Sequence, residues 1–487
     1  MKFKYIAAFA FAVVLASCDI LDKEPSDSWD SGSAIQTVDD LRYAVNGVYE
    51  TQTGNESTFG NYTGDFGLFA DLKGSDYKCV GNNNQATEIS KYTATPTGNL
   101  PEAIYSLFYK SIARANKVME QTKAAGLTGD EVNAYMGELY ALRALFHFDL
   151  ARVYAQLPTV AKSMDDMGIV LATKTFDYTF VPERATLKQT YETILADLDE
   201  AIKLMEPVAS THDKNSTTGH MNYWAALALR ARVNLYLDDV NVNGTTEHNK
   251  LALADAKKII EEGPYSLYKY ADYTSVWAKE FTDESIFEFQ TTSQYNPQRN
   301  SLGYYTDPSG YAEAAMSDSF VEDFVKNPAY TKDIRVSSGM IMEESYGPKQ
   351  ENKAFYTQKY PGRDGQIYVN NAKVFRLSEI YLIAAEAALK TNDETAAAKY
   401  IDDLRKERIA DYVAGSTTSV TLDDILTERR LELNGEGHMA WDMWRNGKSI
   451  NNPVAKEVKS GAYNAVFPIP QANINTSHGA LKQNPGF

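Results

Sequence analysis

Three aspartates stand close together near the start of the chain and raise the question of catalysis. Asp65, Asp71 and Asp76 are separated by six and five residues. Glycoside hydrolases use two carboxyl groups on either side of the bond that they cleave, one as the general acid and the other as nucleophile or base. An acidic chain offers such clusters by chance, and aspartates in turns commonly cap the backbone. We therefore expect these side chains to be structural. A surface glycoside hydrolase stays open as an alternative without an identified catalytic pair.

Other motifs that mark catalysis or cofactor binding are missing from the sequence. It contains no G-x-S-x-G, H-E-x-x-H or G-x-G-x-x-G motif. Gly447-Lys448-Ser449 lacks the upstream glycine of a phosphate-binding loop, because Asp442 occupies that position. The six histidines are scattered and lack the spacing of metal ligands. We expect no catalytic residue, no metal and no cofactor.

Tyrosines in three long aperiodic regions, residues 53–100, 265–313 and 343–372, indicate sugar binding instead. Aromatic rings stack on the C–H faces of sugars, while Asn, Asp and Arg side chains bond the hydroxyl groups. Packing of the loop onto the scaffold is the alternative for each tyrosine. Trp277 is favoured because Trp offers the largest stacking face. The predicted ligand-binding residues are Asp76, Tyr77, Tyr92, Trp277, Tyr295, Arg299, Tyr304 and Tyr305; Trp224, Trp441 and Trp444 lie on periodic segments and are expected in the core.

Helices must position these loops, because apolar residues recur with helical spacing through much of the chain. The fragment Ala-Leu-Arg-Ala occurs twice, at Ala141–Ala144 and Ala228–Ala231, each time in the second helix of an expected pair. Helical pairs that stack through small residues are typical of tetratricopeptide-like arrays. One strand is expected over Ser285–Gln290. The expected helices carry the apolar positions Ile104–Met119, Val132–Val153, Leu187–Met205, Trp224–Leu235, Val374–Ala388, Tyr400–Arg408, Ile425–Leu433 and Met439–Trp444.

The N-terminus resembles a bacterial lipoprotein signal. Lys2 and Lys4 precede an apolar stretch too short to span a bilayer, and it ends in Leu15–Cys18. Such an ending predicts that residues 1–17 are removed and that the Cys18 thiol receives a lipid. An ordinary secretory signal followed by a chance Cys is the alternative. The polar residues 18–36 then form a flexible tether.

The charge and cysteine content of the chain argue against nucleic acid as a partner and against a disulfide. Acidic residues outnumber basic residues by 65 to 48, giving a net charge of −17, and no Lys/Arg-rich run is present. Nucleic acid is therefore an unlikely partner class on electrostatic grounds. Cys79 is the one cysteine left after lipidation, so no intrachain disulfide is expected.

Six segments together resemble the RagB/SusD family of outer-membrane nutrient-binding lipoproteins, along the whole chain. Departures are Ala384-Ala385, where many members carry Arg-Ala, and His438, where Arg is frequent. The segments are Leu15–Cys18 with Leu21, Asp22 and Pro25; Tyr105–Asn116 (YSLFYKSIARAN); Glu138–Tyr154; Phe375–Leu389 (FRLSEIYLIAAEAAL); Ile425–Arg445; and Phe467–Phe487.

This resemblance implies a mostly α, tetratricopeptide-like scaffold with a loop-rich ligand-binding subdomain and little β structure. Residues 37–487 would form the domain, with helical repeats at about 101–260 and 372–447 and binding loops at about 53–100 and 265–371. It also implies a lipid-anchored, surface-exposed outer-membrane protein that captures oligosaccharide and acts as the lid of a SusC-like TonB-dependent transporter, without catalysis. Oligopeptide is the alternative cargo. Buried pairs among Arg376, Glu379, Glu386, Glu428, Arg429 and Glu432 are expected to hold the scaffold.

Overall fold

The computed structural model describes residues 34–54, 59–80, 85–212, 219–238, 244–347 and 349–487. The predicted signal peptide, Cys18 and most of the predicted tether lie outside these ranges. Ile35 is buried in the hydrophobic core, and the Gln36 amide donates a hydrogen bond to Asp40 at 3.1 Å. Ile35 therefore already belongs to the packed domain, although the sequence placed it in the flexible tether, two residues before the predicted domain boundary.

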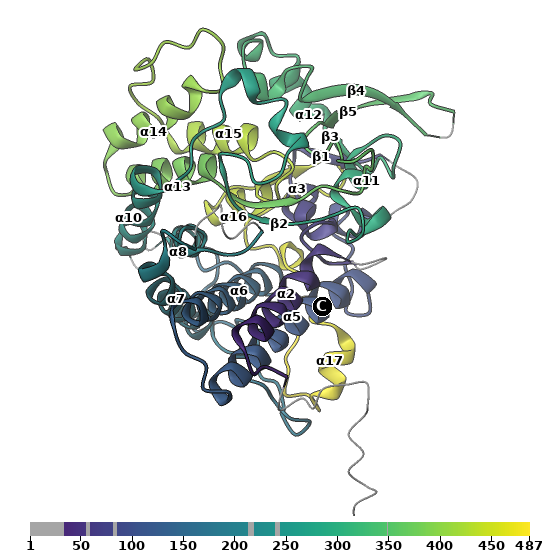
Figure 1. The fold of residues 1–487 in the computed structure, drawn as a ribbon. Coiled ribbons are helices and arrows are strands. Elements are labelled where there is room, and N and C mark those ends of the chain that lie inside the picture. The colour runs from purple at the N-terminus through teal and green to yellow at the C-terminus, as the bar shows by residue number, and fades with distance from the viewer. Residues whose placement is uncertain (1–33, 55–58, 81–84, 213–218, 239–243, 348) are drawn as a thin grey trace, which may run out of the picture.

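Helices dominate the described chain, which confirms the mostly α prediction (Figure 1). No helix within the described residues is long and apolar enough to cross a membrane. The longer helices are α2 (Val38–Thr53), α5 (Asn99–Ala124), α6 (Asp130–Tyr154), α7 (Leu187–Met205), α8 (Tyr223–Leu237), α10 (Glu247–Glu262), α13 (Leu377–Lys390), α14 (Glu394–Lys406) and α15 (Leu422–Glu432). The shorter helices are α3 (Phe69–Lys73), α4 (Thr87–Ser90), α11 (Leu302–Thr306), α12 (Asp318–Phe320), α16 (Met439–Arg445) and α17 (Gln471–Thr476).

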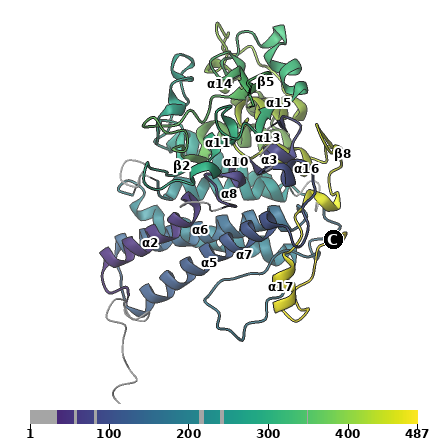
Figure 2. The ribbon, with the colours of Figure 1, turned by 90° about the vertical axis from the view of Figure 1, so that its right-hand side faces the viewer.

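The long helices pack in sequence order, each on the next, from α5 through α6, α7, α8, α10 and α13 to α14. Three of the longer helices begin at capping boxes, in which a threonine and the residue three positions later satisfy each other's backbone N–H groups: Thr37 with Asp40 at α2, Thr186 with Gln189 at α7, and Thr421 with Asp424 at α15. Figure 2 shows α2, α5, α6 and α7 lying below the loop-rich half of the molecule. This arrangement confirms the tetratricopeptide-like scaffold. Helix α2, which packs on α5 and α6, was not predicted.

The arginine of the repeated Ala-Leu-Arg-Ala fragment binds an aspartate of the following long helix in both copies. Arg143 of α6 forms two hydrogen bonds to Asp197 of α7, at 2.6 and 2.8 Å. Arg230 of α8 forms the same two bonds to Asp255 of α10, both at 2.8 Å. Such bidentate pairs fix one helix relative to the next. The sequence repeat therefore corresponds to a structural repeat.

Strands are short and form four separate antiparallel pairs among the described residues. The predicted strand at 285–290 is confirmed by β2. One helix prediction was wrong at its start, since Val374 lies in a strand and α13 begins at Leu377 after the extended Arg376. An apolar run this short fits both periodicities. The pairs are β1 (Tyr77–Cys79) with β3 (Ala314–Met316), β2 (Ser285–Phe289) with β6 (Ala372–Arg376), β4 (Ile341–Tyr346) with β5 (Asn352–Thr357), and β7 (Ile450–Asn452) with β8 (Lys456–Val458).

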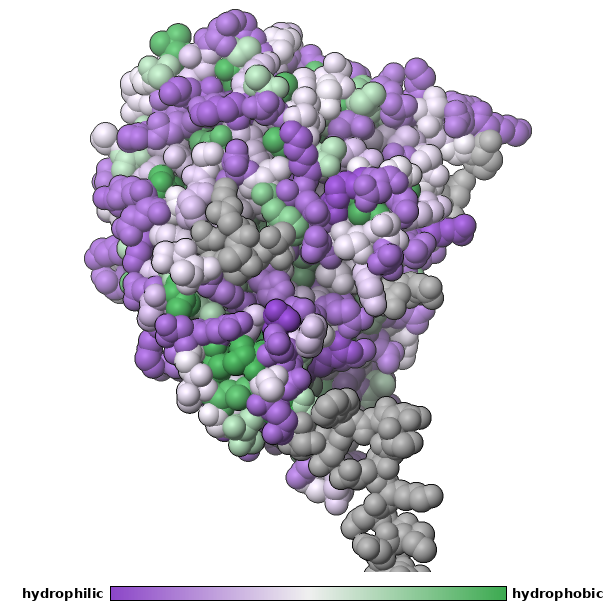
Figure 3. All heavy atoms as spheres, viewed as in Figure 1, coloured by the Kyte–Doolittle hydropathy of each residue, from purple (hydrophilic) through white to green (hydrophobic). Residues whose placement is uncertain are grey.

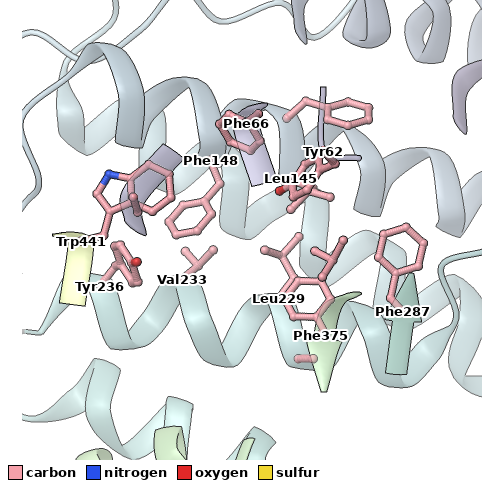
Figure 4. Packing of buried hydrophobic residues seen from close by; sticks show 14 of the residues in the cluster. Tyr62, Phe66, Leu145, Phe148, Leu229, Val233, Tyr236, Phe287, Phe375 and Trp441 are labelled. Atoms are coloured by element: carbon pink, nitrogen blue, oxygen red, sulfur yellow. The ribbon is translucent and has the colours of Figure 1, made fainter. Parts of the chain in front are cut away.

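The main core fills the space between α6 and α8 with aromatic rings from distant segments (Figure 4). Phe148 of α6 meets Tyr236 of α8 edge-on, with ring centroids 5.1 Å apart. Trp441 lies at one end of this core and is stacked on Phe69, with ring centroids 5.6 Å apart. Trp224, Trp441 and Trp444 are all buried, as predicted.

A second feature of the interior is a network of buried charges around Arg376 and Arg408. Arg376 pairs with Glu284 and Glu436, both at 2.7 Å, and with Glu432 at 3.1 Å. Arg408 pairs with Glu432 at 2.9 Å and also with Glu284. The pair of Arg376 with Glu432 confirms the scaffold role that was expected for these two residues. The remaining predicted members pair as Glu379 with Arg232, Glu386 with Arg445, Glu428 with Arg335 and Arg429 with Asp442.

Candidate ligand-binding face

Two regions that the sequence assigned to ligand binding meet in the structure. Strand β1 pairs with β3 in the register Tyr77 to Met316. The Leu302 amide donates to the Thr63 carbonyl at 2.9 Å, and the Glu313 carboxylate accepts the backbone N–H of Ala86 at 2.7 Å. Residues 59–80, 85–92 and 295–316 therefore form one continuous part of the molecule.

Trp277, the favoured single residue for ligand contact, is instead a packing residue. Its side chain is buried in a small cluster with Tyr268 and Tyr273. The Lys359 ammonium lies 4.6 Å from its ring centroid, and the Arg376 guanidinium carbon 5.1 Å. The ring therefore covers the buried charge network, where cation–π contacts and apolar burial hold it. The prediction that Trp277 presents its face to a ligand is corrected.

Four further predicted contact residues are buried as well. Tyr77 donates to the Asn434 side chain at 2.8 Å, and Tyr92 donates to the Lys73 carbonyl while its ring lies 4.2 Å from the Lys73 ammonium. Asp76 forms an ion pair with Arg430 at 2.7 Å. Tyr305 is fully buried. The binding role predicted for Asp76, Tyr77, Tyr92 and Tyr305 is corrected in the same way: the first three use their polar groups to hold the loops, and the Tyr305 ring lies in the core.

The other three predicted residues are accessible. Tyr295 is 53% exposed, Arg299 is exposed and Tyr304 is half-buried. Tyr304 lies in a group that we call the tyrosine cluster, with Tyr311 and Tyr368 at ring-centroid distances of 4.7 and 5.5 Å. Burial raises the pKa of the Tyr311 phenol, and the nearby Arg299 guanidinium partly offsets that rise. The cluster therefore combines half-exposed aromatic rings with a cation.

Sequence reasoning did not select Tyr311 or Tyr368, although two glycines mark their position. A side chain at Gly303 would meet the Ile367 carbonyl oxygen at 2.2 Å, and one at Gly310 would meet the Tyr304 carbonyl oxygen at 2.3 Å. These glycines let three pieces of backbone approach closely enough for the three rings to meet. Gly-Tyr pairs in the aromatic loops were therefore the signal that could have identified the cluster.

Tyr295 borders a pocket of about 300 Å³, which we call the Tyr295 pocket. This volume is at the lower end of ligand-binding pockets. Aromatic, amide, carboxylate and imidazole groups surround it, a combination that can stack on a sugar ring and bond its hydroxyl groups. Its lining residues are Asn46, Tyr49, Glu50, Thr53, Gly219, His220, Phe289, Gln290 and Tyr295.

A buried carboxylate holds one wall of the Tyr295 pocket in place. Glu138 of α6 accepts a hydrogen bond from the Tyr49 hydroxyl at 2.6 Å and lies 2.8 Å from His220 Nδ1 and 2.7 Å from His212 Nε2. Burial by itself raises the pKa of Glu138, but the two histidines outweigh it and lower the pKa to about 2. Burial also lowers the pKa of His220, and the Glu138 charge more than reverses this effect. The pair therefore holds the His220 side chain against α6.

The side chains of the three aspartates Asp65, Asp71 and Asp76 are engaged by other groups of the protein. Asp65 accepts the Gly60 amide at 2.7 Å, and Asp71 accepts the Gly437 amide at 2.6 Å. Burial raises the pKa of both Asp65 and Asp71 to about 7. The cavity that Asp71 and Asp76 line measures only about 10 Å³. None of the three can flank a bound sugar in this arrangement, as glycoside cleavage requires. Within the described ranges, no group of three His, Cys, Asp or Glu residues is arranged to hold a metal ion.

Comparisons with known proteins agree across the chain. A family described as "Starch-binding associating with outer membrane" (SusD-like) matches residues 19–235, and the SusD family (SusD/RagB) matches residues 352–487. SusD-like protein P38 of Formosa agariphila is 23% identical over 90% of this chain and 90% of its own length.

Solved structures give the same result for the fold. A SusD superfamily protein of Bacteroides thetaiotaomicron is 27% identical and covers 92% of this chain and 100% of its own, with a TM-score of 0.81. A SusD superfamily protein of Bacteroides vulgatus is 29% identical over 93% of this chain and 100% of its own, with a TM-score of 0.80. Surface glycan-binding protein A of B. thetaiotaomicron, solved with laminarihexaose, is 21% identical over 92% of this chain and 99% of its own, with a TM-score of 0.72.

Proposed function

The chain belongs to the SusD family, whose members are outer-membrane-associated and bind carbohydrate rather than catalyse, and we propose from this premise that it captures oligosaccharides at the cell surface. The observation that carries the proposal is the tyrosine cluster, with Arg299 beside it. Laminarihexaose in the related glycan-binding protein supports a glycan as the ligand class.

The tyrosine cluster and the Tyr295 pocket would both contact the oligosaccharide. Half-exposed rings supply apolar area that a sugar ring covers, worth about 25 cal/mol per Å². Arg299, Gln290 and Asn46 would bond the hydroxyl groups. Most of the face in Figure 3 is hydrophilic, with small separate apolar patches, so a ligand with many hydroxyl groups suits it. Because the Tyr295 pocket rests on α2 and on Glu138 of α6, the rigid scaffold holds the groups that contact the ligand.

We propose that the captured oligosaccharide passes to a SusC-like TonB-dependent transporter, for which this protein acts as the lid. A lid must bind, close and release, and an array of packed helices gives it a rigid body for that motion. Lipid on Cys18 would tether it to the outer membrane. Mass spectrometry of the native N-terminal peptide should show acylated Cys18, and Cys18→Ala should release soluble protein. An unmodified Cys18 in the mature protein would disprove the anchor.

We also propose that the protein does not hydrolyse its ligand, because Asp65, Asp71 and Asp76 are occupied by backbone amides and Arg430. Product analysis after long incubation with polysaccharides should show no turnover. Cleavage that disappears in Asp71→Asn or Asp76→Asn protein would overturn this proposal.

Oligopeptide is the second candidate ligand, and one observation favours it. The β4–β5 hairpin is a two-stranded sheet that projects from the body at the right of Figure 1. A two-stranded sheet leaves backbone groups at its edges, to which an extended peptide can add as a further strand.

Isothermal calorimetry of the parent protein separates the two ligand classes. The panel would contain laminarihexaose, hexasaccharides of maltose, xylose and mannose type, and unstructured peptides of five to ten residues. We expect saturable binding of at least one oligosaccharide, weakened by Tyr304→Ala. Binding of peptides alone would replace the glycan proposal by the peptide proposal.

A further inference from the structure

A cluster of exposed aromatic residues lies on the connection between α6 and α7, away from the proposed binding face. Phe176, Tyr178, Phe180 and Val181 are 37%, 99%, 39% and 49% exposed. Folded monomers seldom leave so many large apolar side chains together in water without a use for them. The connection runs beside the C-terminal helix α17 (Figure 2).

A pocket of about 330 Å³, which we call the α5–α17 pocket, lies under these residues. Helix α5 supplies one wall with Tyr105 and Tyr109, whose rings lie 4.6 Å apart. Phe176 and Phe180 supply another wall. Asn473 and Thr476 of α17 stand at the rim. It shares no lining residue with the Tyr295 pocket or the tyrosine cluster.

Several hydrogen bonds hold the connection in this position. The Asn116 side-chain amide donates to the carbonyl oxygens of Ala172 and Lys174 at 2.9 and 3.0 Å. Arg143, already paired with Asp197, donates to the Thr173 carbonyl at 2.8 Å. The Thr175 amide donates to Glu120 at 2.8 Å. The scaffold therefore fixes the backbone just before Phe176, and the aromatic wall is built on a rigid base.

The two phenylalanines form a flat platform. Their ring centroids are 3.7 Å apart and their planes differ by 15°, so they are stacked face to face. The Lys174 ammonium lies 5.7 Å from the Phe176 centroid. A stacked pair leaves an outer aromatic face free, which is the surface that the C–H groups of a sugar ring contact.

We infer that the α5–α17 pocket is a second carbohydrate-binding site, which takes about one or two sugar rings of a neutral or acidic oligosaccharide. The volume fits a small ligand. Rings from Tyr105, Tyr109, Phe176 and Phe180 provide stacking surfaces. Asn473, Thr476 and Lys174 provide hydrogen-bonding groups around them. None of the pocket's described lining residues is Asp or Glu, so an acidic sugar meets no opposing carboxylate.

A second site would let the protein bind a long glycan at two points. Two weak sites on one rigid body raise the local concentration of a polymer that reaches both, without any new contact at either site. This inference rests on the proposed function, because it assumes a glycan ligand. The second site would keep the polymer bound while the tyrosine cluster binds the segment that passes to the transporter.

The test compares three variants for binding of laminarihexaose, or of the hexasaccharide that the panel selects, and of the parent polysaccharide. Phe176→Ala/Phe180→Ala removes the platform, and Asn473→Ala removes a polar rim group without touching the rings. Tyr304→Ala disables the proposed primary site. Tyr43→Ala and Val413→Ala are the controls, since these side chains are 66% and 71% exposed elsewhere. Thermal melting checks that each variant is folded.

We expect two binding sites by calorimetry in the parent and one in the Phe176/Phe180 variant, with retardation by the polysaccharide in native gels reduced roughly tenfold. Asn473→Ala should weaken the second site, and the controls should match the parent. Parental stoichiometry and retardation in the folded Phe176/Phe180 variant would overturn the second site and leave the proposed function intact. A variant that keeps its sugar binding but loses association with the transporter would overturn it too, in favour of a protein contact. Absence of sugar binding by the parent would instead remove the proposed function.

Discussion

Two aromatic connections flank strand β2, residues 265–284 before it and 290–313 after it, and they lie in different environments. In the first, Tyr268, Tyr273 and Trp277 are buried above Arg376 and Lys359. In the second, Tyr295 and Tyr304 keep rings in contact with solvent. The first connection shields charges from water, whereas Tyr295 of the second borders a solvent-accessible pocket. Aromatic content alone therefore does not identify a binding loop; what lies beneath the loop decides its role.

Shielding matters because isolated charges are costly in the protein interior. Arg376 and Arg408 are almost completely buried and share the carboxylates of Glu284 and Glu432, and Arg376 also pairs with Glu436. Removing one partner from such a group leaves the others uncompensated. Water that entered through a missing aromatic ring would disturb the same balance. The first connection is thus part of the fold, and the second is available for function.

The largest expected effect is that of Arg376→Ala. It leaves three carboxylates short of a partner, so the free energy of unfolding should fall by about 3–5 kcal/mol. Urea unfolding followed by circular dichroism measures it. Arg42→Ala is the control, because its pair with Asp39 is exposed and should contribute less than about 1 kcal/mol. Equal effects of the two substitutions would contradict the shielding interpretation.

Trp277→Ala should come next, with a loss of about 3 kcal/mol in the free energy of unfolding, because a buried aromatic ring is removed. Sugar affinity of the folded fraction should stay at the parental value. Tyr295→Ala, in the other connection, should leave the unfolding curve unchanged. If Trp277→Ala unfolds like the parent but binds sugar more weakly, the two connections have been assigned the wrong way round.

Tyr304→Ala should weaken oligosaccharide binding by about 1–2 kcal/mol, roughly tenfold in Kd, because interface anchors are typically aromatic. Because Tyr304 is half-buried, we also expect a small decrease in melting temperature, which does not contradict the prediction. Calorimetry with the selected hexasaccharide measures the affinity, and Tyr43→Ala serves as the exposed tyrosine control. Parental affinity in folded Tyr304→Ala protein would remove the tyrosine cluster from the site.

The smallest expected effect is a pH dependence of the free energy of unfolding, which arises from the His220–Glu138 pair beside the Tyr295 pocket. The raised pKa of His220 contributes stability that is complete below about pH 6.5 and is lost as the pH rises through the folded value. Glu138, with its pKa lowered to about 2, contributes stability above about pH 4.5 that is lost as the pH falls toward 2. His220→Gln should therefore reduce the decrease in stability between pH 6 and 8. Melting curves across this range test it, and an unchanged pH profile would exclude the His220–Glu138 pair as its source.

Much of the fold could be predicted from the sequence, and about half of the candidate site could not. Periodic apolar residues identified α5 to α8 correctly because each of these helices buries one or more faces along its whole length. Val374 was misassigned because a short apolar run fits a strand as well. Trp277 and Tyr295 look alike in sequence, since both lie in aromatic loops. Their difference depends on Arg376 and Lys359, which reach Trp277 from distant parts of the chain.

The contact between α3 and the C-terminal region has a consequence for how the chain folds in time. Asp71 binds the amide of Gly437, 366 residues later, and Lys73 donates to the Asn464 carbonyl. Phe69 is covered by Trp441. Contacts between residues so far apart form late and slow the folding reaction. The contacts that cover Phe69 and hold Asp71 can therefore form only when nearly the whole chain is present, and until then these residues lack their final partners.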